Sequence, residues 1–164
     1  MIRAAILLSC ALVGGCGLKP LYSGGTGGSV AMTLRQVDVA PIEGRSGWLV
    51  ANALRDRLVT AEGGALYRLD IRLDDRIAGL GVRRDDSVAR ERRTLRARYQ
   101  LVELATGSVL LDATAGSDAG IDVVGSEYAT IAAENTALER LSDIVADKIV
   151  ARVALYAQRR AAGK

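Results

Sequence analysis

Apolar and polar residues alternate in four stretches of the chain, and this alternation predicts β-strands. The pattern is clearest over residues 66–74, where Tyr67, Leu69, Ile71 and Leu73 are separated by arginines and aspartates. Three other stretches follow the same rule: 32–39, which Pro41 ends, 89–104 and 109–115. Each predicted strand therefore has one apolar face and one strongly polar face.

Two further stretches carry apolar residues at helical spacing. In the first, Val50, Leu54, Leu58 and Ala61 form one stripe along a helix expected at residues 47–61. The second is a single helix over residues 126–158, which at about 1.5 Å per residue would be roughly 50 Å long. Its apolar face consists of Ile131, Leu138, Leu141, Val145, Ile149, Val153 and Tyr156.

Glycine-rich stretches mark the expected connections. A loop containing Gly79, Gly81 and Asp85-Asp86 follows residue 74, and another covers residues 116–125. Gly107 favours a tight hairpin turn between residues 104 and 109, because glycine tolerates positive φ. The order β-α-β-β-β-α predicts an α+β fold in which a mostly antiparallel four-stranded sheet has two helices packed on one face. The other face of the sheet would be wet and charged.

The N-terminal segment is expected to be a lipoprotein signal. Arg3 precedes ten apolar residues, 4–13, which are too few to span a bilayer but suit a signal peptide. Val13-Gly14-Gly15-Cys16 resembles a lipobox, in which the cysteine thiol accepts the lipid. An ordinary signal cleaved elsewhere, or an uncleaved anchor, is the alternative.

Cleavage at the lipobox defines three parts of the chain. Residues 1–15 are the signal peptide, residues 16–30 are the lipidated Cys16 with a flexible glycine-rich tether, and residues 31–164 form a single α+β domain. Gly17 follows the cysteine, where an Asp would favour retention at the inner membrane. We therefore expect an outer-membrane lipoprotein on the periplasmic side.

Composition restricts the chemistry that the domain can perform. The chain contains no His, and its only cysteine after residue 15 is the one expected to carry lipid. Zinc sites, cysteine nucleophiles and Ser-His-Asp triads are therefore excluded, and no cofactor or catalytic residue is predicted. The carboxylate pairs Asp74-Asp75 and Asp85-Asp86 are better explained as solvated loop residues than as an acid and base. A net charge of +3 is too small to indicate nucleic acid.

Arginines provide the one candidate binding surface. Arg92, Arg96 and Arg98 share a strand parity, and Arg68 and Arg72 can lie on the same face across the sheet. Guanidinium groups match the oxygens of phosphates, so a ligand with several phosphates would suit this row. The alternative is that these arginines only pair with Asp70 and Asp74. Trp48 is expected to pack inside the domain rather than to anchor a partner.

Short motifs in a characteristic order resemble a known family. Residues 16–22, Cys-Gly-Leu-Lys-Pro-Leu-Tyr, are similar to the start of the mature lipopolysaccharide-assembly lipoproteins, the LptE family. Other segments resemble the first strand and helix, the hairpin and the C-terminal helix of that family: Val39-Ala40-Pro41-Ile42 with Arg45, 54–58, Thr106-Gly107, Tyr128-Ala129, Ala133-Glu134, Ala137, Arg140, Ala146 and Ile149. The match extends over most of the chain after residue 15.

This resemblance implies a function as well as a fold. It implies residence as a plug inside the LptD β-barrel of the outer membrane, help in assembling that barrel, and binding and delivery of lipopolysaccharide. Two other functions stay open at this point. One is an auxiliary subunit of another envelope transport complex that is also lipid-anchored, and the other is a lipid-anchored glycan hydrolase that uses carboxylates.

Overall fold

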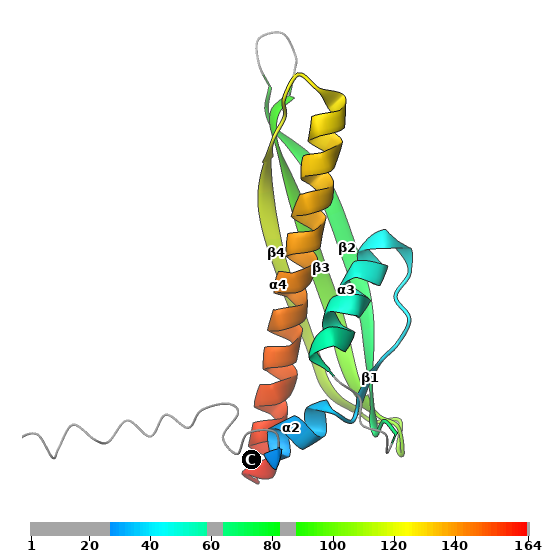
Figure 1. The fold of residues 1–164 in the computed structure, drawn as a ribbon. Helices are drawn as coiled ribbons and strands as arrows, with labels where there is room; N and C mark the ends of the chain where they lie inside the picture. The colour runs from blue at the N-terminus through cyan, green and yellow to red at the C-terminus, as the bar shows by residue number, and fades with distance from the viewer. Residues whose placement is uncertain (1–26, 59–63, 83–87, 164) are drawn as a thin grey trace, which may run out of the picture.

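The computed structural model describes residues 27–58, 64–82 and 88–163. The predicted signal peptide, Cys16 and residues 17–26 of the predicted tether lie outside these residues. The described elements are α2 (Ser29–Leu34), β1 (Val37–Val39), α3 (Gly44–Arg57), β2 (Tyr67–Val82), β3 (Val88–Glu103), β4 (Val109–Asp122) and α4 (Glu127–Ala161) (Figure 1).

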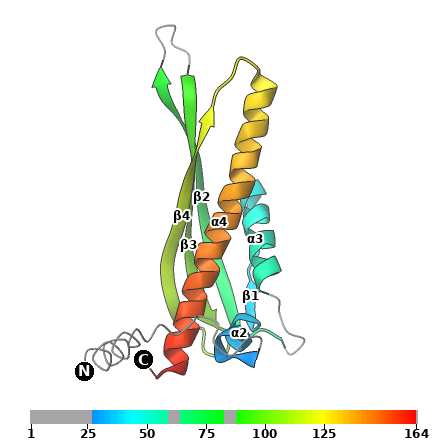
Figure 2. The same cartoon turned by 60° about the vertical axis from the view of Figure 1, so that its left-hand side comes forward.

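The four strands form one mixed sheet in the order β1-β2-β3-β4. The short strand β1 runs parallel to β2, whereas β2, β3 and β4 are antiparallel. Helices α3 and α4 lie on the same side of this sheet, and α4 runs along most of its length (Figure 2). The α+β class and the two helices on one face are therefore confirmed, and the parallel β1 makes the sheet mixed.

The first predicted strand was partly wrong, because residues 32–34 belong to helix α2. Val30 and Leu34 are one helical turn apart and both are buried, and α2 packs against α4. The Thr33 hydroxyl donates to the Ser29 carbonyl inside the same turn. This tertiary contact decides the local structure, so only Val37–Val39 remain as a strand.

Two predicted loops were wrong in large part. Strand β2 continues through Gly79 to Val82, and β4 continues through Gly116 and Gly120 to Asp122. Strand β3 has 16 residues and pairs along nearly all of its length with both neighbours, so it supplies ladder partners for these glycines. The helix ends differ less, since α3 begins three residues earlier than the predicted residue 47 and α4 ends at Ala161.

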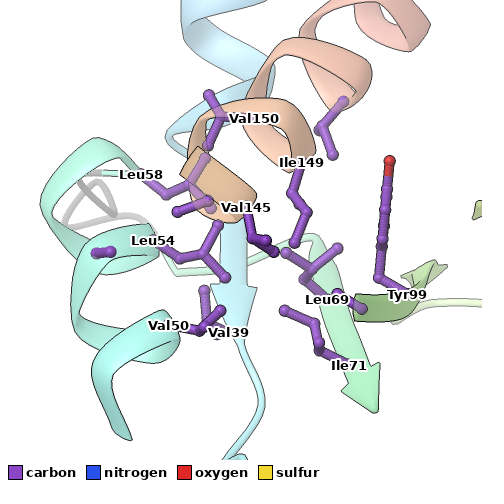
Figure 3. Packing of buried hydrophobic residues seen from close by; sticks show 14 of the residues in the cluster. Val39, Val50, Leu54, Leu58, Leu69, Ile71, Tyr99, Val145, Ile149 and Val150 are labelled. Atoms are coloured by element: carbon purple, nitrogen blue, oxygen red, sulfur yellow. The ribbon is translucent and has the colours of Figure 1, made fainter. Parts of the chain in front are cut away.

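The core lies between the sheet and the two long helices. Val50 and Leu54 of α3 and Val145 of α4 are fully buried, and they pack near Leu69 and Ile71 of β2 (Figure 3). Most residues of the apolar faces predicted from the sequence therefore meet in the core. Two predicted core residues do not: Ile131 of α4 is 48% exposed, and Trp48 is 63% exposed because it lies on the outer side of α3.

Candidate functional site

The open face of the sheet, away from the helices, carries most of the charged strand residues. Even-numbered residues of β2, β3 and β4 are cross-strand partners and share this face. They include seven arginines and five aspartates, which we call the arginine face: Arg68, Arg72, Arg76, Arg90, Arg92, Arg96 and Arg98, with Asp70, Asp74, Asp112, Asp118 and Asp122. The arginine face thus has an excess of two positive charges.

All five arginines predicted as ligand contacts lie on the arginine face. Arg72 is directly opposite Arg98 in the β2–β3 ladder, and Arg96 is two residues further along β3. Arg93 has the opposite parity and faces the helices, as the alternation predicts. It contacts Asp75 at 2.9 Å and 2.7 Å and donates to the Glu134 carbonyl at 3.0 Å.

Two of the five predicted arginines are held firmly by aspartates. Arg68 donates two hydrogen bonds to Asp70, at 2.7 Å and 2.9 Å. Arg98 donates two to Asp112, at 3.3 Å and 3.0 Å, and Gln100 donates a third to the same carboxylate at 2.9 Å. These bonds lower the pKa of Asp112 and raise the pKa of Arg98. The sequence suggested Asp70 and Asp74 as the partners of these arginines. Arg68 does pair with Asp70, but Arg98 pairs with Asp112 of β4.

Arg72 and Arg96 are different, because neither side chain has an ion pair or hydrogen bond among the described residues. Asp74 lies directly opposite Arg96, but its carboxylate binds Arg76 at 2.8 Å. Both arginines are exposed. Like charges directly across a ladder are unfavourable, so the Arg72–Arg98 pair adds positive potential that Asp112 offsets only in part.

The remaining predicted arginine, Arg92, is intermediate. Its Nε lies 3.9 Å from an oxygen of Asp118, which is too long for a hydrogen bond but within ion-pair range. At more than half exposed, this contact contributes little to binding or stability. Arg92 therefore has no firm partner, and it lies six residues along β3 from Arg98.

An open hollow of about 540 Å³ lies on the arginine face. Arg72, Arg96 and Arg98 line it, together with hydroxyl groups of β3 and β4. Gly116 forms part of its lining, and a Cβ there would approach the Arg96 Cγ to 3.1 Å. Arg72 and Arg98 also line a second hollow of about 410 Å³. Arg72 and Arg98 therefore line both hollows, and Arg96 lines the larger of the two.

Sequence reasoning missed Arg76 and the aspartates of β4. The signal was present, because polar or glycine residues recur at every second position from 112 to 122. Interpreting the glycines as a loop concealed this alternation.

The carboxylate pairs do not form an acid–base site in the described part of the chain. Asp74 and Asp75 are adjacent on a strand, so they point to opposite faces and bind Arg76 and Arg93 respectively. The pair Asp85-Asp86 lies outside the described residues. Across residues 27–58, 64–82 and 88–163, no group of three carboxylate, His or Cys side chains is placed to hold a metal.

Comparison with known proteins gives a family and a fold. The family model described as LptE, Lipopolysaccharide-assembly, matches residues 34–153, and no curated protein matches the chain. A solved lipoprotein structure from Caulobacter crescentus is 22% identical, with a TM-score of 0.69 over 80% of this chain and 98% of that one.

More distant structures share the same fold. Rare lipoprotein B from Shewanella oneidensis is 14% identical, with a TM-score of 0.52 over 73% of this chain and 93% of that one. A minor lipoprotein from Acinetobacter baumannii is 12% identical, with a TM-score of 0.56 over 74% and 92%. None of the described helices is long and apolar enough to cross a membrane.

Proposed function

The chain belongs to the LptE lipopolysaccharide-assembly family, and from this premise we propose what it binds and where it acts. It is a lipoprotein of the outer membrane, held on the periplasmic side by an acylated Cys16. It plugs an LptD-type β-barrel, helps that barrel to assemble, and assists delivery of lipopolysaccharide to the cell surface. It has no catalytic role, and the arginine face binds the anionic part of lipopolysaccharide.

One observation carries the ligand assignment: Arg72 and Arg96 lack an ion partner among the described residues, and both lie next to Arg98 on the same face. Phosphates are the groups that several guanidinium forks bind best. Residues two apart on a strand are about 7 Å apart, so Arg96 and Arg98 can contact two phosphates of one molecule. Arg68 and Arg92 lie further along the same face, and we expect them to contribute less than this centre.

The same face suits a barrel lumen. The interior of an outer-membrane barrel is polar. The helices cover one side of the sheet (Figure 2) and bury its apolar residues, and the arginine face on the other side stays open. This arrangement supports a plug whose charged face meets the barrel wall or the ligand within it.

The test is lipopolysaccharide binding by the purified full-length lipoprotein at two salt concentrations. We expect Arg72→Gln with Arg96→Gln to weaken binding by about tenfold or more, because each charge-assisted hydrogen bond contributes roughly 1.5–3 kcal/mol before screening by salt. The matched control is Arg90→Gln, which removes an arginine of the same face that is already paired with Asp122 and that lines neither hollow. The control should retain most of the affinity.

A stability control separates binding from folding. Leu101 is fully buried, so Leu101→Ala should destabilise the fold by about 2–5 kcal/mol and leave the affinity of the folded protein unchanged. Equal affinity for wild type and the well-folded Arg72/Arg96 double variant, with no salt dependence, would remove these arginines from the ligand site.

A further inference from the structure

The sheet has two open edges, and they differ in protection. No described strand pairs with β4 on its outer side. There the Lys148 ammonium, from α4, donates to the Gly116 carbonyl at 2.6 Å. A lysine at an edge discourages a further strand from adding, so this edge is guarded.

The edge of β2 lacks such a guard over most of its length. Strand β1 pairs only with Tyr67–Leu69, and the last hydrogen bond runs from the Ala40 N–H to the Leu69 carbonyl at 3.1 Å. The chain turns away at Pro41, which a continued register would place opposite Ile71. In Figure 1, β1 accordingly lies beside only one end of the long strand β2.

Backbone groups along the rest of this edge are unpaired on their outer side. Because the groups of Leu69 point toward β1, those of Ile71, Leu73, Asp75 and Ile77 point to the same edge. No backbone hydrogen bond reaches them from any other described residue. The edge therefore offers a regular row of donors and acceptors.

A groove lies against this row. It has a volume of about 520 Å³ and lies between β2 residues 71–75 and the segment that leads into α3, which contributes Pro41 and Ile42. The groove contains two acidic residues, and neither pairs with Arg72. Asp75 is paired with Arg93, and Glu43 is exposed on the opposite wall of the groove. The groove is thus open beside the unpaired backbone.

We propose that the β2 edge from Ile71 to Ile77 binds an extended polypeptide segment as an added strand, in which apolar residues alternate with acidic ones. A row of main-chain donors and acceptors is recognised by another strand. Apolar residues of that strand would extend the apolar side that carries Ile71 and Leu73. Its acidic residues would lie on the open face beside Arg72, where an opposite charge is the favourable cross-strand neighbour. This binding does not depend on lipopolysaccharide.

The experiment uses the isotope-labelled full-length chain and a seven-residue probe peptide of alternating Val and Asp, capped at both ends. Amide exchange and chemical shifts are followed by NMR up to millimolar peptide. The amides of Leu73, Asp75 and Ile77 should exchange quickly in the free protein and at least about tenfold more slowly with peptide, because they become hydrogen-bonded.

Three matched variants test the chemistry. A Val–Lys peptide of the same length should bind about two- to fivefold more weakly, and Arg72→Glu should reverse that preference. A Val–Asp peptide that is N-methylated at alternate residues should not bind, because it lacks the donors that a strand needs. Arg90→Glu, on the same face but on β3, should leave the preference unchanged.

Several results would overturn the assignment. Slow exchange of these amides in the free protein would mean that the chain itself covers the edge. Protection only at the β4 edge, or none at millimolar peptide, would also contradict it. Unchanged lipopolysaccharide binding in any of these cases would leave the proposed function intact.

Discussion

At the scale of single residues, neighbouring arginines of one strand face have different environments. Arg98 binds Asp112 through two nitrogens, whereas Arg96, two residues away, has no ion partner among the described residues. The difference arises from register, because Asp74 opposite Arg96 already binds Arg76. A free guanidinium can bind a ligand without first breaking an internal pair, so Arg96 and Arg72 should contribute more to anion affinity than their paired neighbours.

Gly116 gives a residue-scale prediction about the position of Arg96. A Cβ at Gly116 would lie 3.1 Å from the Arg96 Cγ and 3.2 Å from the Leu95 carbonyl oxygen. Gly116→Ala should therefore move the Arg96 stem and reduce lipopolysaccharide affinity by a factor of about 2–5, less than removal of the guanidinium. Stability should change by less than about 1 kcal/mol.

Gly120→Ala is the matched control, measured by the same binding titration and thermal unfolding. Gly120 lies on the same strand and face, and no atom is within 4 Å of its virtual Cβ. Equal affinities for the two alanine variants would show that the position of Arg96 does not matter.

Asp112 gives a prediction on pH. Arg98 and Gln100 lower its pKa below the ordinary value of 3.8, so its contribution to stability is present above that value and is lost as the pH falls through the lowered pKa. The wild type should therefore be more stable than Asp112→Asn at neutral pH, and the difference should disappear in strong acid. Urea unfolding from pH 2 to pH 7 measures this difference.

The same substitution frees Arg98 for other anions. Asp112→Asn should bind lipopolysaccharide more tightly than wild type at neutral pH, because the ligand no longer competes with an internal carboxylate. A constant stability difference across the whole pH range would contradict the ion pair, and weaker binding would contradict the assigned role of Arg98.

At the scale of elements, the long strand β3 organises both the core and the charged face. Its odd-numbered residues Leu95, Ala97, Tyr99 and Leu101 are buried, and its even-numbered residues carry the arginines. Arg93 and Asp75 form an ion pair on the helix-facing side of the sheet, next to the buried apolar residues of β3. Their side chains are only 12% and 19% exposed. Arg93 also binds the Glu134 carbonyl of α4, so the pair links two strands to the helix.

Breaking this inner pair should be costly. Asp75→Ala leaves a mostly buried guanidinium without its carboxylate, and we expect a loss of about 3 kcal/mol, at the low end for buried pairs because some solvent reaches it. Asp122→Ala removes the partner of Arg90 in an exposed pair and should cost less than about 1 kcal/mol. Chemical denaturation gives both values.

A double variant distinguishes the ion pair from packing. Asp75→Leu with Arg93→Met should lose less stability than the sum of its single variants, because no charge then remains buried alone. Additive losses would mean that the two side chains act independently.

Element patterns were predictable where burial acts on one face. Alternation in β2 and β3 and the helical stripe of α4 follow directly from one apolar side, so the shared face of the five arginines was predictable too. Helix α2 was not predictable, because a short apolar segment can form a strand or a helix, and here its contact with α4 favours the helix. The pairing of Arg98 with Asp112 depends on the β3–β4 register, which no local pattern contains.

At the scale of the whole molecule, the described fold is elongated and has distinct ends. Helix α4, with 35 residues, spans the sheet from one end to the other, and its C-terminal end lies beside α2 (Figures 1 and 2). Residues 17–28 separate the proposed lipid at Cys16 from the start of α2. An extended chain covers at most about 3.6 Å per residue, so this segment keeps the α2 end within roughly 40 Å of the membrane surface.

The last prediction concerns the anchor and the barrel together. In cells depleted of the wild-type chain, assembled barrel and surface lipopolysaccharide should both fall, and the wild-type gene should restore them. Cys16→Ser should accumulate as an unacylated precursor, because the serine offers no thiol to accept the lipid. A single acyl chain binds membranes only weakly and two or three bind firmly, so a mature domain without acyl chains should stay in outer-membrane fractions only where the barrel holds it. Mass spectrometry of the N-terminus and membrane fractionation measure these outcomes.

The Arg72→Gln/Arg96→Gln variant provides the comparison. It should stay acylated at the outer membrane and support barrel assembly while delivering less lipopolysaccharide, since its defect lies in the proposed ligand site. Normal barrel and surface lipopolysaccharide in depleted cells without a paralogue would contradict the proposed function, and a wild-type mature protein that begins elsewhere than at an acylated Cys16 would contradict the anchor.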